Sequence, residues 1–144
     1  MALFISTTLF EQLRGHAEQT YPHECCGVLV GTFDPAGNKT VSTVVACGNA
    51  RTDSPHNRYR ISPQELVRVQ REARAAGFAI VGFYHSHPDQ PAQWSDVDLA
   101  EAYWSGCSYV ITGVERGKAA LTRSFLLVQE AETRSFAPEA IEHQ

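Results

Sequence analysis

Short apolar runs separated by turn-forming residues predict most of the strands. They cover residues 3–6, 25–33, 39–49, 78–84, 107–114 and 119–129. The run at 78–84, FAIVGFY, shows no polar alternation, which is typical of a central strand covered on both faces. The runs at 25–33 and 39–49 flank the turn sequence DPAGN and are expected to pair as a hairpin. Residues 119–129 form an edge strand or hairpin partner, and the tail 131–144 is a last strand or a frayed end.

Two longer stretches have the spacing of amphipathic helices. The first opens with the capping-box spacing of Thr8 and Glu11 and ends before Pro22. Its apolar stripe consists of Leu9, Leu13 and Ala17. The second begins at the cap Ser62 and stops at Gly77. Its inward-facing positions are Leu66, Val69, Ala73 and Ala76.

A third, shorter helix is predicted from Ser95 to about Trp104. Strands and helices mixed in this order predict an α/β (α+β) fold, in which a central mixed sheet is flanked by about three helices. A chain of 144 residues without an interior linker predicts one domain over residues 1–144.

Composition indicates a globular protein whose charge is unevenly placed. Hydrophobic residues make up 43% and charged residues 19%, and the net charge of −4 argues against nucleic acid as the main partner. No basic residue occurs from 75 to 115, which is the acidic part of the chain. One segment instead gathers Arg51, Arg58, Arg60, Arg68, Arg71 and Arg74. A basic surface and an acidic site are expected to face the same substrate.

No apolar run approaches the roughly twenty residues of a membrane span, and the N-terminus has neither a basic start nor a cleavage site. We therefore expect a cytoplasmic protein with no membrane partner. In that reducing compartment, four cysteines without CxxC spacing are expected to be buried thiols: Cys25, Cys26, Cys47 and Cys107.

The candidate chemistry comes directly after the buried strand. His85 and His87 are separated by one residue, so in extended backbone both imidazoles point to the same side and can reach one metal ion. Asp98, in the first turn of the third helix, can supply another ligand. Two imidazoles and one carboxylate leave a tetrahedral zinc one position short, as catalysis with water requires.

A purely structural interpretation is also open. Ser95 with Asp98 is an ordinary helix cap with an acid at the third position, and paired histidines are often unligated. The two interpretations are compatible, because a capping serine and a first-turn aspartate can also face a substrate or a metal.

The combined pattern resembles the JAMM motif of the MPN-plus metalloproteases, written His-x-His, seven residues, Ser, two residues, Asp. His85, His87, Ser95 and Asp98 match it, with the seven residues 88–94 between the second histidine and the serine. That family also has a glutamate upstream, before a small apolar strand, and PHECCGVLVG offers Glu24 in this setting.

The resemblance implies a single MPN/JAMM domain with a topology like that of cytidine deaminases. It implies zinc, one ion per chain, bound by His85, His87 and Asp98, with Glu24 as general base and Ser95 as a donor to the oxyanion. The short chain is most similar to the bacterial stand-alone members that process sulfur-carrier proteins. The implied substrate is a small ubiquitin-like (β-grasp) carrier ending in Gly-Gly, from which an amino acid such as cysteine, or a short extension, is released.

Other function classes are weighed beside this one. A nucleoside deaminase is disfavoured because the H-x-E and P-C-x-x-C patterns are absent. A cysteine hydrolase using Cys25 or Cys26 predicts inhibition by thiol alkylation. A non-catalytic MPN interaction module usually lacks one or more ligands. Many relatives have proline where this chain has Trp94, which leaves the shape of the loop before Ser95 open.

Overall fold

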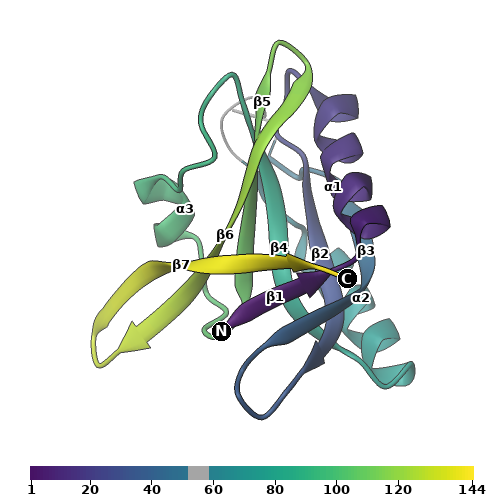
Figure 1. Cartoon of the computed structure of the whole chain (residues 1–144), viewed down its shortest axis with the longest axis vertical. Helices are drawn as coiled ribbons and strands as arrows, with labels where there is room; N and C mark the ends of the chain where they lie inside the picture. The colour runs from purple at the N-terminus through teal and green to yellow at the C-terminus, as the bar shows by residue number, and fades with distance from the viewer. Residues whose placement is uncertain (52–58) are drawn as a thin grey trace.

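The computed structural model describes residues 1–51 and 59–144 (Figure 1). Within these residues there are three helices and seven strands. In chain order they are β1 (Ala2–Ile5), α1 (Thr7–Thr20), β2 (Cys26–Phe33), β3 (Lys39–Cys47), α2 (Pro63–Ala75), β4 (Ala79–Pro88), α3 (Asp96–Ala100), β5 (Ser108–Glu115), β6 (Lys118–Glu130) and β7 (Thr133–His143). Arg58 of the basic cluster lies outside the described residues.

The strands form a mixed sheet, as predicted, but the sheet closes into a barrel in the order β1-β3-β2-β4-β5-β6-β7. The β2–β3 hairpin is antiparallel, whereas β4 pairs with β5 in parallel. Closure depends on the C-terminal tail, which is the strand β7 rather than a frayed end. It pairs antiparallel with β6 and then parallel with β1, alongside which it lies in Figure 1. The sequence predicted the mixed sheet and not its closure.

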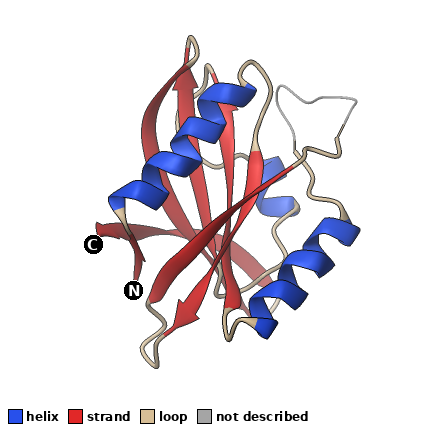
Figure 2. Cartoon of the chain, turned by 90° about the vertical axis from the view of Figure 1, so that its right-hand side faces the viewer, coloured by secondary structure: helices blue, strands red, loops and turns tan. Residues whose placement is uncertain are grey.

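The core consists of two hydrophobic clusters on opposite faces of β4. Val81 and Tyr84 belong to the cluster under α1, with Leu13 of that helix. Phe83 belongs to the cluster under α2, with Val69 of that helix. Figure 2 shows the two long helices on different sides of the strands. The apolar, non-alternating run at 78–84 is therefore explained by a central strand that contributes to both clusters.

The first two helices differ from prediction at their ends. The Oγ of Ser6, not Thr8, accepts a hydrogen bond from the N–H of Leu9 at 3.2 Å and caps α1. Ser62 caps α2 as predicted, and Gly77 comes after that helix in the left-handed conformation, φ 82°. Ala76 is exposed rather than inward-facing, because the helix has already ended there.

The third helix is shorter than the predicted span to Trp104. It ends at Ala100 because the backbone groups that would continue the helix form hydrogen bonds with residues of β5 and β7. Arg134 of β7 donates to the carbonyl oxygens of Ala100 and Ala102, and the N–H of Trp104 donates to the Tyr109 hydroxyl at 3.1 Å. The prediction was wrong because tertiary contacts override local helix preference. No described helix is long and apolar enough to cross a membrane.

Candidate active site

The strand β4 presents two histidines on one face at its C-terminal end. His85 and His87 lie two residues apart, with 2% and 6% of their surface exposed, and their Nε2 atoms are 3.2 Å apart. The Nδ1 of His87 lies 3.0 Å from the carbonyl oxygen of Pro91. Because a carbonyl only accepts, that contact places the proton of a neutral His87 on Nδ1 and leaves the Nε2 lone pair free to bind a metal.

The helix α3 brings a carboxylate to the same point. Asp98 Oδ1 lies 3.2 Å from the Nε2 of His85, and Asp98 Oδ2 lies 3.2 Å from the Nε2 of His87. Ser95 and Asp98 also form a reciprocal capping box. The Asp98 N–H donates to Ser95 Oγ at 3.1 Å, and the Ser95 N–H donates to Asp98 Oδ2 at 2.9 Å. Asp98 therefore takes part in the helix cap and also contacts both histidines, so the two interpretations of the sequence hold together.

The pairing of β2 with β4 delivers Glu24 to the histidines. Cys26, the first residue of β2, pairs with His85 in an antiparallel register, so Glu24, two residues before it, faces His87. Ser86, between the two histidines, fixes this register. Its N–H donates to the Cys25 carbonyl at 3.3 Å, and its Oγ accepts from the Cys25 N–H at 2.8 Å. A carboxylate oxygen of Glu24 and one nitrogen of each histidine lie within 4.8 Å of one another.

Burial and mutual charge set the protonation of these groups. Glu24 is only 3% exposed, and this burial raises its pKa to about 8. Burial would also raise the pKa of Asp98, but its close contacts with the His85 and His87 imidazoles outweigh this effect and hold that pKa well below its usual range. Burial lowers the pKa of His85. A glutamate with a pKa near neutrality is suited to accept and return a proton.

The arrangement fits a metal ion. Ligand atoms about 2.0–2.1 Å from a tetrahedral zinc lie about 3.3 Å from one another, close to the 3.2 Å separations between the two Nε2 atoms and the Asp98 oxygens. Among buried side-chain polar atoms of the described residues, only Glu24 Oε1 and His85 Nδ1 lack a hydrogen-bond partner. Unpaired buried polar atoms are rare and mark a place where a ligand or a reaction supplies the partner. The residues can therefore hold a metal beside an unpaired carboxylate.

Comparison with known families agrees with this geometry. The family model described as prokaryotic homologs of the JAB domain matches residues 6–128. The chain belongs to this prokaryotic JAB-domain family. The resemblance to the JAMM metalloproteases is confirmed, because their motif lies within the matched span.

Several proteins whose names state an activity are similar to this chain. A desampylase of Haloferax volcanii is 37% identical over 62% of this chain, and the match spans 62% of the desampylase. A probable TtuB-protein conjugate cleaving protease of Thermus thermophilus is 30% identical over 92% of this chain and 80% of its own. A CysO-cysteine peptidase of Mycobacterium tuberculosis is 29% identical over 91% and 86%.

A solved structure supports the fold assignment. A protein from Desulfitobacterium hafniense superposes with a TM-score of 0.80 at 26% identity, covering 99% of this chain and 94% of that one. The mixed α+β arrangement is thus the fold of the JAB-domain family. The predicted likeness to cytidine deaminases and the single-domain assignment stay predictions.

Sequence reasoning missed Tyr59. Its ring stacks on the imidazole of His85, with centroids 4.4 Å apart and planes at 22°. No motif marks this residue, because it lies in a loop between β3 and α2 and only the fold brings it to β4. Trp94, by contrast, packs edge-on against Phe136 with centroids 5.6 Å apart, which indicates a packing role for this residue.

Proposed function

We propose that this protein is a zinc-dependent JAMM-type peptidase that hydrolyses the bond after the C-terminal Gly-Gly of a ubiquitin-like sulfur-carrier protein. The product beyond the bond is an amino acid such as cysteine or a short extension. The proposal depends mainly on one observation. Two imidazole nitrogens and a carboxylate converge at 3.2 Å beside the buried, unpaired carboxylate oxygen of Glu24.

In this proposal His85, His87 and Asp98 hold the zinc. Bound zinc supplies a Lewis acid for the carbonyl and lowers the pKa of its water to about 7. Glu24 takes the proton of the attacking water and delivers it to the leaving amine, a role suited to a buried carboxyl group whose Oε1 has no hydrogen-bond partner. The Ser95 Oγ accepts from the Asp98 N–H, so its own O–H remains available as a donor to the developing oxyanion.

The substrate class is proposed from the named activities of the relatives. One is named for cleaving TtuB-protein conjugates and another for cleaving CysO-cysteine. Both names join one partner, TtuB or CysO, to a second group, and they differ in that second group. For this chain we infer the same division: a carrier whose glycine tail reaches the metal, and then a variable leaving group. Glycines suit such a tail because their backbone can pass close to the site.

The thiol alternative has less support than the metal site. All four cysteines are buried and unbridged. Burial raises the pKa of Cys25 to about 11, which disfavours the thiolate that a nucleophile requires. Within the described residues, no hydrogen bond joins Cys25 or Cys26 to a histidine. A non-catalytic interaction module is disfavoured because all the motif residues are present.

The test is to measure zinc content and cleavage of a β-grasp carrier ending in Gly-Gly-Cys. Wild type is expected to bind one zinc per chain and release cysteine, whereas His87→Ala loses both. Alkylation of the cysteines in the folded protein leaves activity intact. A wild-type protein that binds no zinc, or cleavage that survives chelation and fails after alkylation, would contradict the proposal.

A further inference from the structure

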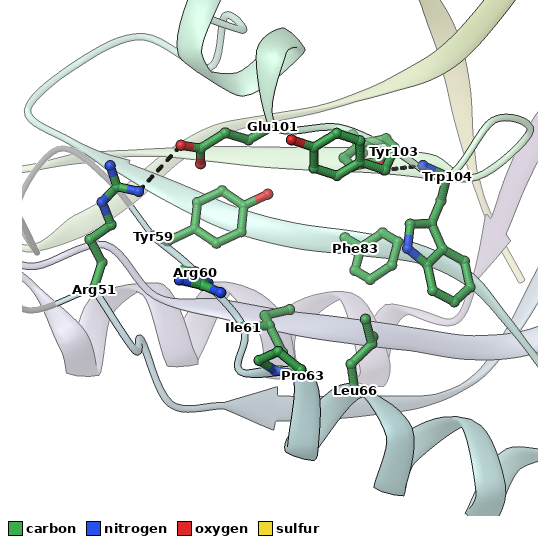
Figure 3. A pocket seen from close by; sticks show the side chains of 11 residues that line it. Arg51, Tyr59, Arg60, Ile61, Pro63, Leu66, Phe83, Glu101, Tyr103 and Trp104 are labelled. Carbon is green, nitrogen blue, oxygen red and sulfur yellow. Dashed lines mark hydrogen bonds and ion pairs between the residues drawn. The ribbon is translucent and has the colours of Figure 1, made fainter.

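A cavity of about 470 Å³ opens beside the metal-ligand cluster (Figure 3). It lies between the start of α2 and the segment after α3. Phe83 and Trp104 line one side, and Ile61 and Leu66 line the other. The metal ligands themselves do not line it, so the chemistry proposed above leaves this cavity unused.

The cavity is continuous with the active site through two features. Tyr59 lines the cavity and also stacks on His85, so one ring forms the wall between them. Phe83, His85 and His87 occupy alternate positions of β4 and therefore face the same side of the strand. Alternate residues of a strand are about 7 Å apart, which places the Phe83 end of the cavity about that far from His85.

That separation corresponds to two residues of an extended peptide, which advances about 3.3 Å per residue. On the basis of the proposed function, the residue at the metal is the last glycine of the carrier, and its neighbour is the other glycine. We infer that the cavity binds the side chain of the residue immediately before the diglycine. That residue is the nearest one of the tail to carry a side chain, and it is where the enzyme can select among carriers.

The lining defines the chemistry of the side chain. Aromatic and aliphatic groups predominate, so a large apolar side chain such as leucine or phenylalanine fits. A small side chain leaves the cavity poorly filled, and a charged one loses its hydration there. Arg60 is exposed at the rim and forms no ion pair with any described residue, so an acidic residue elsewhere in the tail is favoured. Arg60 belongs to the basic segment identified in the sequence, so through Arg60 that segment contributes to substrate choice.

The position of the cavity suits a residue of the carrier tail, before the cleaved bond, better than it suits the leaving group after that bond. The proposed substrates share a carrier in front of the bond and differ beyond it, where a single amino acid can be the whole leaving group. A leaving group of one residue does not extend two positions from the metal. A mostly apolar cavity at that distance can therefore serve only the tail of the carrier.

The experiment compares carriers ending in X-Gly-Gly-Cys, with X as leucine, phenylalanine or alanine. Wild type is expected to cleave the leucine carrier with kcat/KM about 10-fold or more above the alanine carrier. Leu66→Trp fills the cavity and abolishes this preference, while Leu66→Ala enlarges it and shifts the preference from leucine toward phenylalanine. Val67→Trp is the matched control. Val67 is the next residue of α2, is 49% exposed, does not line the cavity, and its variant keeps the wild-type preference.

Two results would overturn the inference while the proposed function stands. One is equal cleavage of the three carriers by wild type. The other is that Leu66→Trp keeps the wild-type preference for the residue before the diglycine and changes the preference for the residue after the bond. Failure of wild type to cleave any of the carriers, with zinc bound, refutes the proposed function and the inference with it. Zinc content is measured in every variant and is expected to equal that of wild type.

Discussion

This barrel contains two buried clusters of charged and polar side chains. They differ in whether the buried polar atoms have hydrogen-bond partners. The paired cluster joins β3 to β7. Lys39 Nζ lies 2.7 Å from Glu139 Oε2, and the hydroxyls of Ser108 and Ser124 donate to Glu139 Oε1 at 2.5 and 2.8 Å. The open cluster is that of Glu24, His85, His87 and Asp98, in which Glu24 Oε1 and His85 Nδ1 have no partner.

The difference separates a structural role from a chemical one. Glu139 pairs with Ser124, and the next residue of β7 pairs with β1, so the paired cluster lies where β7 passes from one neighbour to the other and the barrel closes. Each oxygen of its carboxylate is satisfied. In the open cluster the carboxylate of Glu24 is buried without such compensation, which costs stability and leaves an acceptor available for reaction.

The strongest test of the open cluster is Glu24→Gln, which keeps the shape and removes the base. We expect kcat to fall about 10²–10⁴-fold, because this is the usual contribution of a positioned general base. Zinc content stays at the wild-type value, since the ligands are untouched. The assay is steady-state cleavage of the carrier with parallel metal analysis.

The matched control for Glu24→Gln is Asp96→Asn, which also neutralises one carboxylate. Asp96 is exposed in the first turn of α3, beside the site but outside the cluster. Its kcat is expected to stay at the wild-type value. A Glu24→Gln enzyme as fast as Asp96→Asn would mean that the unpaired carboxylate has no part in the chemistry.

The paired cluster is tested by Glu139→Leu, which leaves Lys39 buried without its partner. The free energy of unfolding is expected to fall by about 3–5 kcal/mol, the usual cost of breaking a buried ion pair from one side. Urea denaturation measures it. The double variant Lys39→Met with Glu139→Leu should recover most of the loss, because two apolar side chains leave no unpaired charge. Equal instability of the single and double variants would refute the ion-pair explanation.

The open cluster also predicts a response to pH in the metal-free protein. Burial raises the pKa of Glu24 from 4.5 to about 8. The neutral carboxyl is therefore favoured by folding, and its stabilisation is present below pH 4.5 and is lost as the pH rises toward 8. Relative to Glu24→Gln, wild type should lose on the order of 3 kcal/mol between pH 5 and pH 8. Urea unfolding of both proteins at the two pH values measures this. An unchanged difference between them would place Glu24 in contact with water.

Local sequence signals predicted the parts of the site that lie close together in the chain. The spacing of His85 and His87 on a strand and the cap formed by Ser95 and Asp98 are expected from periodicity and helix-start rules, and the structure brings all four side chains together. Glu24 lies about sixty residues upstream, and only the β2–β4 register places it there. The family resemblance identified it, because no local spacing links Glu24 to the histidines.

The features that the sequence did not predict depend on contacts across the fold. Barrel closure requires the register of β7 against both β6 and β1, and no periodicity in the tail encodes a second partner. The early end of α3 depends on Arg134, more than thirty residues further along. Lys39 and Glu139 are both charged residues, for which burial is the exception.

The smallest expected effect concerns the unpaired nitrogen of the open cluster. Metal-ligating histidines usually donate their second nitrogen to a neighbour that fixes the ring, as the Pro91 carbonyl does for His87. For His85 the stacked ring of Tyr59 takes that place. Tyr59→Leu should therefore weaken zinc binding about 10-fold, the lower end of the range for such supporting contacts, while Tyr59→Phe keeps the ring and the affinity. Competition with a chelator measures both without substrate. If Tyr59→Leu binds zinc as tightly as Tyr59→Phe, the orientation of His85 is set by β4 alone.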